Sequence, residues 1–187
     1  MAPTGCVANA GYNNRFGIIP ALRPAGAGPR SSLPPDITPR PAPRLPLTDT
    51  DRERSEQDVL QVADMVAKEY GVDPARTYLF GTSAGGGGAW HFAQKFPRRW
   101  RAVVASAAPL RVDIYPFSRL KGLPVLVVHG DRDDATSFDA SAAMVQHAKR
   151  LGLVVTFLPV PGGDHFEAWA TVATQIVDFF ARHGASR

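Results

Sequence analysis

Apolar residues in this chain gather in four short runs and in four longer stretches with helical spacing. The runs predict strands and are residues 78–80, 102–107, 125–128 and 154–160. The stretches predict helices and are residues 51–70, 84–96, 137–151 and 166–183. Continuous runs rich in β-branched residues are typical of strands covered on both faces of a parallel sheet. The two kinds of element alternate, which predicts an α/β fold with a mostly parallel sheet.

The first predicted helix, residues 51–70, has a clear helical pattern. Its apolar positions recur three and four residues apart, at Val59, Val62, Ala63, Val66 and Tyr70. Lys68 stands in the last turn, where a cation is favourable, and Gly71 follows as a stop signal. These features predict a helix with one apolar face.

A glycine-rich turn joins the first apolar run to the second predicted helix. Gly81, Ser83 and Gly85 give it the pattern G-x-S-x-G. In this layout the serine stands at the tip of a strand-to-helix turn, and the glycines keep side chains away from the neighbouring backbone. The free N–H groups at the start of the helix, that of Ala84 first, are placed to hold a developing oxyanion. Ser83 is therefore a candidate nucleophile.

Two alternatives remain for this turn. It could serve only as a glycine-rich helix entry that allows close packing. A phosphate-binding loop fits less well. Such a loop has the pattern G-x-x-x-x-G-K-[ST], in which a lysine follows the second glycine, but Gly87 follows Gly86 here. A base and an acid elsewhere in the chain would favour the nucleophile over both alternatives.

Candidates for that acid and base follow the last two apolar runs. In hydrolases with this turn, the acid comes after the serine in the chain and the histidine comes last. Asp131, Asp133 and Asp134 stand in one loop at the carboxyl end of a predicted strand, and His165 stands in the glycine-rich loop after the next one. Asp131 could instead hold its own loop, and Asp134 could cap the next helix. Asp133 is the favoured acid, but the three compete.

The other histidines are weaker candidates for the base. Those in predicted helices or near the C-terminus are His91, His147 and His183. His129 precedes a glycine at a strand end, where we expect its ring to brace the loop. A metal site of His129, Asp131 and Asp133 has suitable ligand types. We do not favour it, because the turn at Ser83 already accounts for this loop, and we expect no metal or organic cofactor.

With these motifs the chain resembles the serine α/β-hydrolases, in particular the esterase-like branch related to polyhydroxybutyrate depolymerases, feruloyl esterases, dienelactone hydrolases and prolyl oligopeptidases. The stretches that carry the likeness are 72–76, 81–85, 95–97, 102–107, 127–130 with Asp133, and 161–165. In that family the acid stands four positions after the histidine of a His-Gly pair, which implies Asp133. The resemblance covers about residues 55–181. It implies hydrolysis of a carboxylic ester by Ser83, Asp133 and His165 through an acyl-enzyme.

The front of the chain departs from the family pattern. Residues 1–16 contain no clear apolar strand, and residues 20–46 are crowded with proline, which is typical of an extended or disordered segment. We therefore divide the chain into a Pro/Arg-rich segment, 1–48, and a hydrolase domain, 49–187, whose fold is expected to be incomplete at its N-terminus. The loop that supplies a second oxyanion N–H is not evident, and Asn13-Asn14 is a weak candidate.

An incomplete sheet would expose an unpaired strand edge, which favours self-association with a second chain. It would also leave the oxyanion with one donor, the N–H of Ala84, and losing one donor lowers the rate by about a hundredfold to a thousandfold. The alternative to a working esterase is therefore a catalytically impaired fragment derived from a hydrolase. The length of 187 residues fits one domain.

Charge and composition limit the classes of partner that we expect for the chain. The net charge is +4, and the cluster 98–101 could form a nucleic-acid patch, but a solvated helix end is the favoured interpretation. Cys6 is the single cysteine, so an internal disulfide is excluded. No apolar run reaches the ~18 residues of a membrane span, and a signal peptide is not evident. We expect a small-molecule ester as partner and no nucleic acid or membrane. The sequence does not determine the compartment, for which the cytoplasm is favoured.

Overall fold

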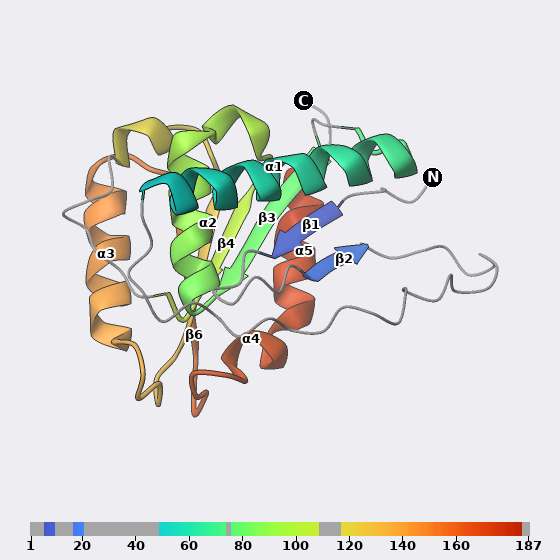
Figure 1. Ribbon diagram of the computed structural model, residues 1–187. Coiled ribbons are helices and arrows are strands. Elements are labelled where there is room, and N and C mark those ends of the chain that lie inside the picture. Colours follow the sequence, from blue (N-terminus) through green and yellow to red (C-terminus); the bar gives the residue numbers. More distant parts are fainter. Residues whose placement is uncertain (1–5, 10–16, 21–48, 74–75, 109–116, 185–187) are drawn as a thin grey trace.

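The computed structural model describes residues 6–9, 17–20, 49–73, 76–108 and 117–184. Within them a six-stranded sheet lies between helices (Figure 1). The strands are β1 (Cys6–Asn9), β2 (Gly17–Pro20), β3 (Thr77–Thr82), β4 (Val103–Ser106), β5 (Val125–Gly130) and β6 (Val155–Val160). The helices are α1 (Asp49–Tyr70), α2 (Ala84–Lys95), α3 (Phe138–Arg150), α4 (Ala168–Thr171) and α5 (Ala173–Gly184), with the 3₁₀ turns η2 (Pro97–Arg99) and η3 (Phe117–Leu120).

The sheet is mostly parallel, as the sequence predicts. Its strand order is β2-β1-β3-β4-β5-β6, and only the pair β1–β2 is antiparallel. The carboxyl ends of β3, β5 and β6 therefore meet at one edge of the sheet. This is the edge at which open α/β sheets place their sites.

Strands β1 and β2 were not foreseen, because each has only four residues and lacks a long apolar run. They correct the expectation that residues 1–16 hold no strand. β1 pairs with β3 in parallel register, so β3 has a neighbour on each side. The edges of the described sheet are β2 and β6. The rest of residues 1–48 lies outside the described residues, and the division of the chain at residue 48 stays a prediction.

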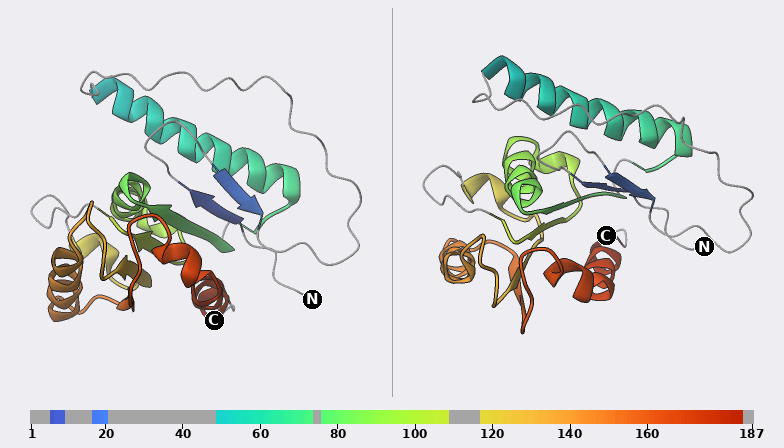
Figure 2. Two further views of the ribbon diagram at one scale, coloured as in Figure 1. Left: turned by 90° about the horizontal axis from the view of Figure 1, so that it is seen from below. Right: turned by 60° about the horizontal axis from the view of Figure 1, so that its bottom comes forward.

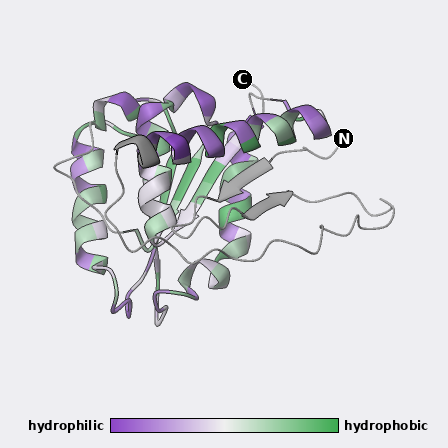
Figure 3. Ribbon diagram, in the orientation of Figure 1, coloured by the Kyte–Doolittle hydropathy of each residue, from purple (hydrophilic) through white to green (hydrophobic). Residues whose placement is uncertain are grey.

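The strands β3 to β5 are buried on both faces, and alternate residues face opposite layers. One layer packs α1, α2 and α3 against side chains such as Leu79 and Val103. The other layer packs α4 and α5 against side chains such as Phe80 and Val104. Figure 3 shows β3 and β4 as strongly hydrophobic segments and α1 as a mostly hydrophilic helix in front of the sheet. This double burial explains why these strands appear as continuous apolar runs in the sequence.

Helix α1 contacts the rest of the domain through few of its residues. Val59 is its one buried apolar residue among the described side chains, while Tyr70 is 66% exposed. Glu56 accepts hydrogen bonds from His91, at 2.6 Å, and from Lys95, both on α2. These bonds outweigh burial, which alone would raise the pKa of Glu56, and they lower it. Figure 2 shows α1 as the outermost helix on its side of the sheet.

The last predicted helix is two helices in the structure. α4 ends at Thr171, and α5 begins at Ala173. The chain before α4 is held in a turn by Asp164, which accepts hydrogen bonds from the N–H groups of Phe166 and Glu167. The helix prediction therefore began two residues too early and missed the break. Among the described helices, none is long and apolar enough to cross a lipid bilayer.

Candidate active site

Ser83 occupies the tip of the turn between β3 and α2 with an unusual backbone. Its φ is 55° and its ψ is −127°, a conformation that L-residues rarely adopt. The N–H of Ser83 donates to the carbonyl of Ser106 at 2.9 Å, and its own carbonyl accepts from Gly86 and Gly87. Because both backbone groups are tied to fixed elements, the strained turn is held and the side chain projects from the sheet edge.

The glycines of the turn allow two close approaches. A Cβ on Gly81 would overlap the carbonyl oxygen of Gly85. A Cβ on Gly86 would lie 2.8 Å from the Cβ of Ala108 and 2.8 Å from the carbonyl oxygen of Ser106. α2 can therefore press against β4 only because these positions carry no side chain. Close packing at these glycines accounts for how Ser83 is presented.

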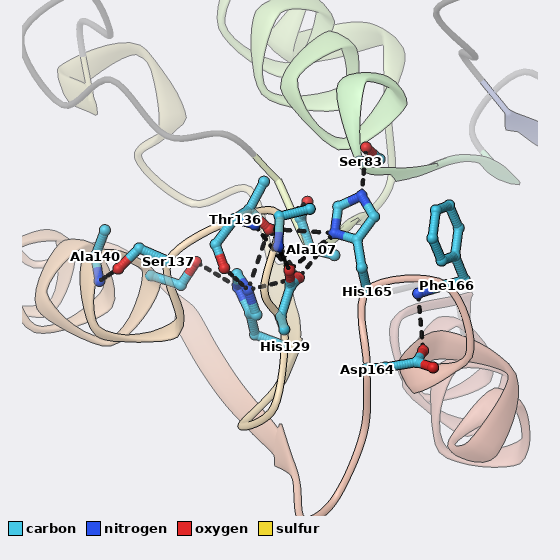
Figure 4. Close-up of polar contacts among 12 residues, drawn as sticks. Ser83, Ala107, His129, Thr136, Ser137, Ala140, Asp164, His165 and Phe166 are labelled. Carbon is cyan, nitrogen blue, oxygen red and sulfur yellow. Dashed lines mark hydrogen bonds and ion pairs between the residues drawn. The ribbon is translucent and has the colours of Figure 1, made fainter.

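The structure brings Ser83, His165 and Asp133 into one hydrogen-bonded line. Figure 4 shows the contact between Ser83 and His165. Nε2 of His165 lies 2.8 Å from Oγ of Ser83. Nδ1 of the same ring lies 3.0 Å and 2.9 Å from the two carboxylate oxygens of Asp133. Since a carboxylate only accepts, Nδ1 carries the hydrogen and Nε2 is free to accept the proton of the Ser83 hydroxyl.

Asp133 is held as an anion. Burial alone would raise its pKa, but hydrogen bonds from the N–H of Thr136, from His165, from the Thr136 hydroxyl and from the N–H of Ala135 lower it to about 2. The Thr136 N–H and hydroxyl each lie 2.8 Å from the carboxylate, and the Ala135 N–H lies 2.9 Å away. The sequence analysis missed Thr136, although an acid followed by a threonine three residues later is a turn pattern that could have pointed to it.

His129 braces this loop, as the sequence predicts, and it does so by contacting the carboxylate itself. Its ring is completely buried, and its Nε2 lies 3.0 Å from Oδ2 of Asp133. Its Nδ1 lies 2.7 Å from the hydroxyl of Ser141 on α3. Nε2 therefore donates to Asp133, and in the neutral ring Nδ1 accepts from Ser141.

Asp131 and Asp134, the two acids that compete with Asp133 in sequence, lie elsewhere in the loop. Asp131 accepts a hydrogen bond at 2.7 Å from the N–H of Gly162, so it joins the acid loop to the histidine loop. Asp134 is exposed, and α3 is capped instead by Ser137, which accepts from the N–H of Ala140. A Cβ on Gly130 would overlap the carbonyl oxygen of Gly163, so the two loops also touch through their backbones.

The proposed oxyanion donor, Ala84, is the first residue of α2. Its N–H is one of the helix-start groups that lack a partner within the helix. The candidate Asn13-Asn14 lies outside the described residues. The role of Ala84 stays a prediction.

The remaining candidate histidines lie outside the line of Ser83, His165 and Asp133. His91 bonds to Glu56, and the His147 ring packs against Phe117. The pKa of His183 is lowered by burial and by the charges of Arg182 and Arg101. In the part of the chain that the structure describes, no three His, Cys, Asp or Glu side chains are grouped so as to hold a metal ion.

Comparison with known proteins gives two kinds of similarity in sequence. The prolyl oligopeptidase family matches residues 49–118, which include α1, the Ser83 turn and β4. A bifunctional acetylxylan esterase/xylanase of Neocallimastix patriciarum is 27% identical over 103 residues. That alignment covers 54% of this chain but only 15% of the relative, so the chain spans a small part of that protein's length.

Solved structures with the same fold include several esterases. A thermostable esterase superposes with a TM-score of 0.61 at 21% identity, over 69% of this chain and 36% of its own. The esterase PE8 superposes with a TM-score of 0.56 at 25% identity, over 73% of this chain and 63% of its own. The parallel sheet and the serine turn are therefore consistent with the similarity to these esterases. Over residues 49–118 the chain is similar to the prolyl oligopeptidase family, and its fold is that of the α/β-hydrolases.

Proposed function

We propose that the protein hydrolyses carboxylic esters with Ser83 as nucleophile, His165 as base and Asp133 as the group that orients the histidine. The line of contacts from Ser83 Oγ to His165 Nε2, at 2.8 Å, and from Nδ1 to Asp133, at 2.9 Å, carries this proposal. Contacts of this length are within the range needed for proton transfer between nucleophile and base. Ser83 is only partly buried, which is compatible with attack on a bound ester.

The reaction would proceed in two halves. Oγ of Ser83 attacks the carbonyl carbon while its proton moves to Nε2 of His165, and Asp133 stabilises the imidazolium that forms. The tetrahedral intermediate then collapses, the bond to the alcohol oxygen breaks, and Nε2 returns the proton to that oxygen. Water attacks the acyl-enzyme in the same way, with His165 again as base. The N–H of Ala84 would hold the oxyanion in both halves.

An ester is preferred to a peptide as substrate on two grounds. The relatives named above include an acetylxylan esterase and two esterases, which supports ester chemistry. The prolyl oligopeptidase match supports the serine-hydrolase machinery but concerns residues 49–118 alone. The alternative is a hydrolase-derived fragment without turnover.

The test is hydrolysis of a short-chain nitrophenyl ester by the purified protein beside its Ser83→Ala variant. We expect turnover that falls to the buffer rate in the variant, because no other described nucleophile contacts His165 at Nε2. Thermal unfolding of both proteins checks that they are equally folded. Equal rates in the two proteins, or a folded parent without turnover, would favour the non-catalytic alternative.

Self-association through an open sheet edge is kept as a second, separate proposal. β6 lies at one edge of the described sheet and pairs only with β5 there. An edge strand offers unpaired N–H and C=O groups to a second copy of the chain. Light scattering over a range of concentrations should give a mass that rises above 20.1 kDa, and a constant monomer mass would contradict the proposal.

A further inference from the structure

We propose that Phe166 contacts the alcohol part of the ester, so that the protein prefers esters whose alcohol carries an aromatic or other apolar group. This inference rests on the proposed ester hydrolysis and concerns the same site. Phe166 directly follows His165 in the chain. The histidine is 6% exposed, whereas Phe166 is 79% exposed, the largest exposure among the described large apolar residues.

A single exposed apolar side chain is common and needs no function. Phe166 differs because its position is fixed beside the catalytic ring. Asp164 accepts hydrogen bonds from the N–H of Phe166 at 2.9 Å and from the N–H of Glu167 at 2.8 Å, which holds the backbone of this turn. The Phe166 ring then stands edge to face with the His165 imidazole, with ring centroids 5.1 Å apart and an angle of 86°.

The rings show which part of a substrate would lie here. In Figure 4 the Phe166 ring stands beside the imidazole and extends in the direction of Nε2, the nitrogen that faces Ser83. Asp133 contacts the same imidazole through Nδ1, the nitrogen on the other side of the ring. Phe166 is therefore an exposed apolar surface beside the nitrogen that handles the proton.

The chemistry of the first half-reaction assigns this surface to the alcohol. The bond from Oγ of Ser83 to the carbonyl carbon forms, the bond from that carbon to the alcohol oxygen breaks, and the proton from Oγ passes through Nε2 to the departing oxygen. The departing oxygen must come within hydrogen-bond reach of Nε2. The carbon group attached to it then lies next to whatever flanks the imidazole, which here is Phe166. The acyl group stays on Ser83 and has no such constraint.

The test compares Phe166→Ala with the parent on three esters, using kcat/KM. Benzyl acetate carries a phenyl group on the alcohol, ethyl phenylacetate carries one on the acyl part, and ethyl acetate carries none. For each protein, the kcat/KM of each aromatic ester is divided by the kcat/KM of ethyl acetate. This ratio removes any general loss of activity in the variant. We expect the benzyl acetate ratio to fall about tenfold in Phe166→Ala, within the range for a lost apolar pocket contact. The ethyl phenylacetate ratio should stay within about twofold, since its phenyl group belongs to the acyl part, which stays on Ser83.

Controls separate this inference from the proposed function. Met65→Ala removes another exposed apolar side chain, 59% exposed on α1, and should change neither ratio. Phe166→Tyr keeps the ring and should retain most of the benzyl acetate ratio. A fall confined to ethyl phenylacetate, or no change in either ratio, would overturn the inference while leaving the esterase in place. A parent that hydrolyses none of the three esters would overturn both.

Discussion

The Nε2 atom of His129 lies 3.0 Å from Oδ2 of Asp133, the carboxylate oxygen that also lies 2.9 Å from Nδ1 of His165. One carboxylate thus receives hydrogen bonds from two histidines, of which only His165 contacts Ser83 in the described structure. His129 is completely buried and is anchored in turn by Ser141 on α3. The acid is therefore oriented by the buried His129 as well as by its own loop.

The Ser141→Ala variant tests this second support. Without the hydroxyl, Nδ1 of His129 loses its hydrogen-bond partner, so the ring that donates from Nε2 to Asp133 is held less firmly. Losing one neutral hydrogen bond of about 1 kcal/mol corresponds to about fivefold in rate, so we expect kcat to fall about fivefold with KM unchanged. The control is Ser137→Ala, which removes the cap of α3 and should lower the melting temperature without this fall in kcat. An unaltered kcat in Ser141→Ala would show that the contact has no part in orienting Asp133.

The two acids of the loop should respond differently to amidation. Asp133→Asn should lower kcat by about 10⁴-fold, because an amide can present its NH₂ group to Nδ1 of His165 and favour the wrong tautomer. Asp131→Asn should lower kcat less than about tenfold, because its amide oxygen can still accept from the N–H of Gly162. Steady-state kinetics of both variants show which of the two acids orients His165. The reverse order of effects would identify Asp131 as the orienting acid.

The lowered pKa of Asp133 makes a prediction for stability at acid pH. Its folded pKa of about 2 lies below the ordinary value of 3.8, so the unfolded chain takes up this proton first as the pH falls. The stabilisation by the Asp133 carboxylate is therefore complete above pH 3.8 and is lost as the pH falls towards about 2. Urea unfolding of the parent and of Asp133→Asn should show a stability difference that shrinks over this interval. A difference that is constant with pH would contradict the assignment of this pKa.

The backbone of Ser83 predicts a variant that gains stability and loses activity. Glycine adopts a positive φ at little cost, whereas alanine at position 83 keeps the strain of φ 55°. Ser83→Gly should therefore be more stable than Ser83→Ala by about 1 kcal/mol, although both lack the nucleophile. Denaturant unfolding at neutral pH measures this difference. If Ser83→Ala were the more stable variant, the turn would not be strained in solution.

The apolar patterns predicted most of the sheet, because β3, β4 and β5 are buried on both faces and carry little polar sequence. The order of Ser83, Asp133 and His165 also predicted which side chains the fold brings together. The choice of Asp133 over Asp131 needed the resemblance to a family, since the two acids stand two residues apart. Their different partners, His165 for one and Gly162 for the other, are decided by tertiary contacts.

Other features depend on contacts that no local pattern carries. β1 and β2 are too short to stand out and are defined by pairing with each other and with β3. The network from Asp133 through His129 to Ser141 joins a strand end to the first turns of α3. The break between α4 and α5 falls at Val172, where an apolar periodicity alone indicates a continuous helix. In each case the sequence supplies suitable residues, and packing selects the arrangement.

The most direct measurement is the mass of the protein after rapid acid quenching during turnover of a nitrophenyl acetate ester. The account predicts an added acetyl group on the peptide that contains Ser83, which disappears as the ester is exhausted, and no such adduct in Ser83→Ala. An adduct on another residue, or ester turnover without any adduct on Ser83, would contradict the proposed acyl-enzyme.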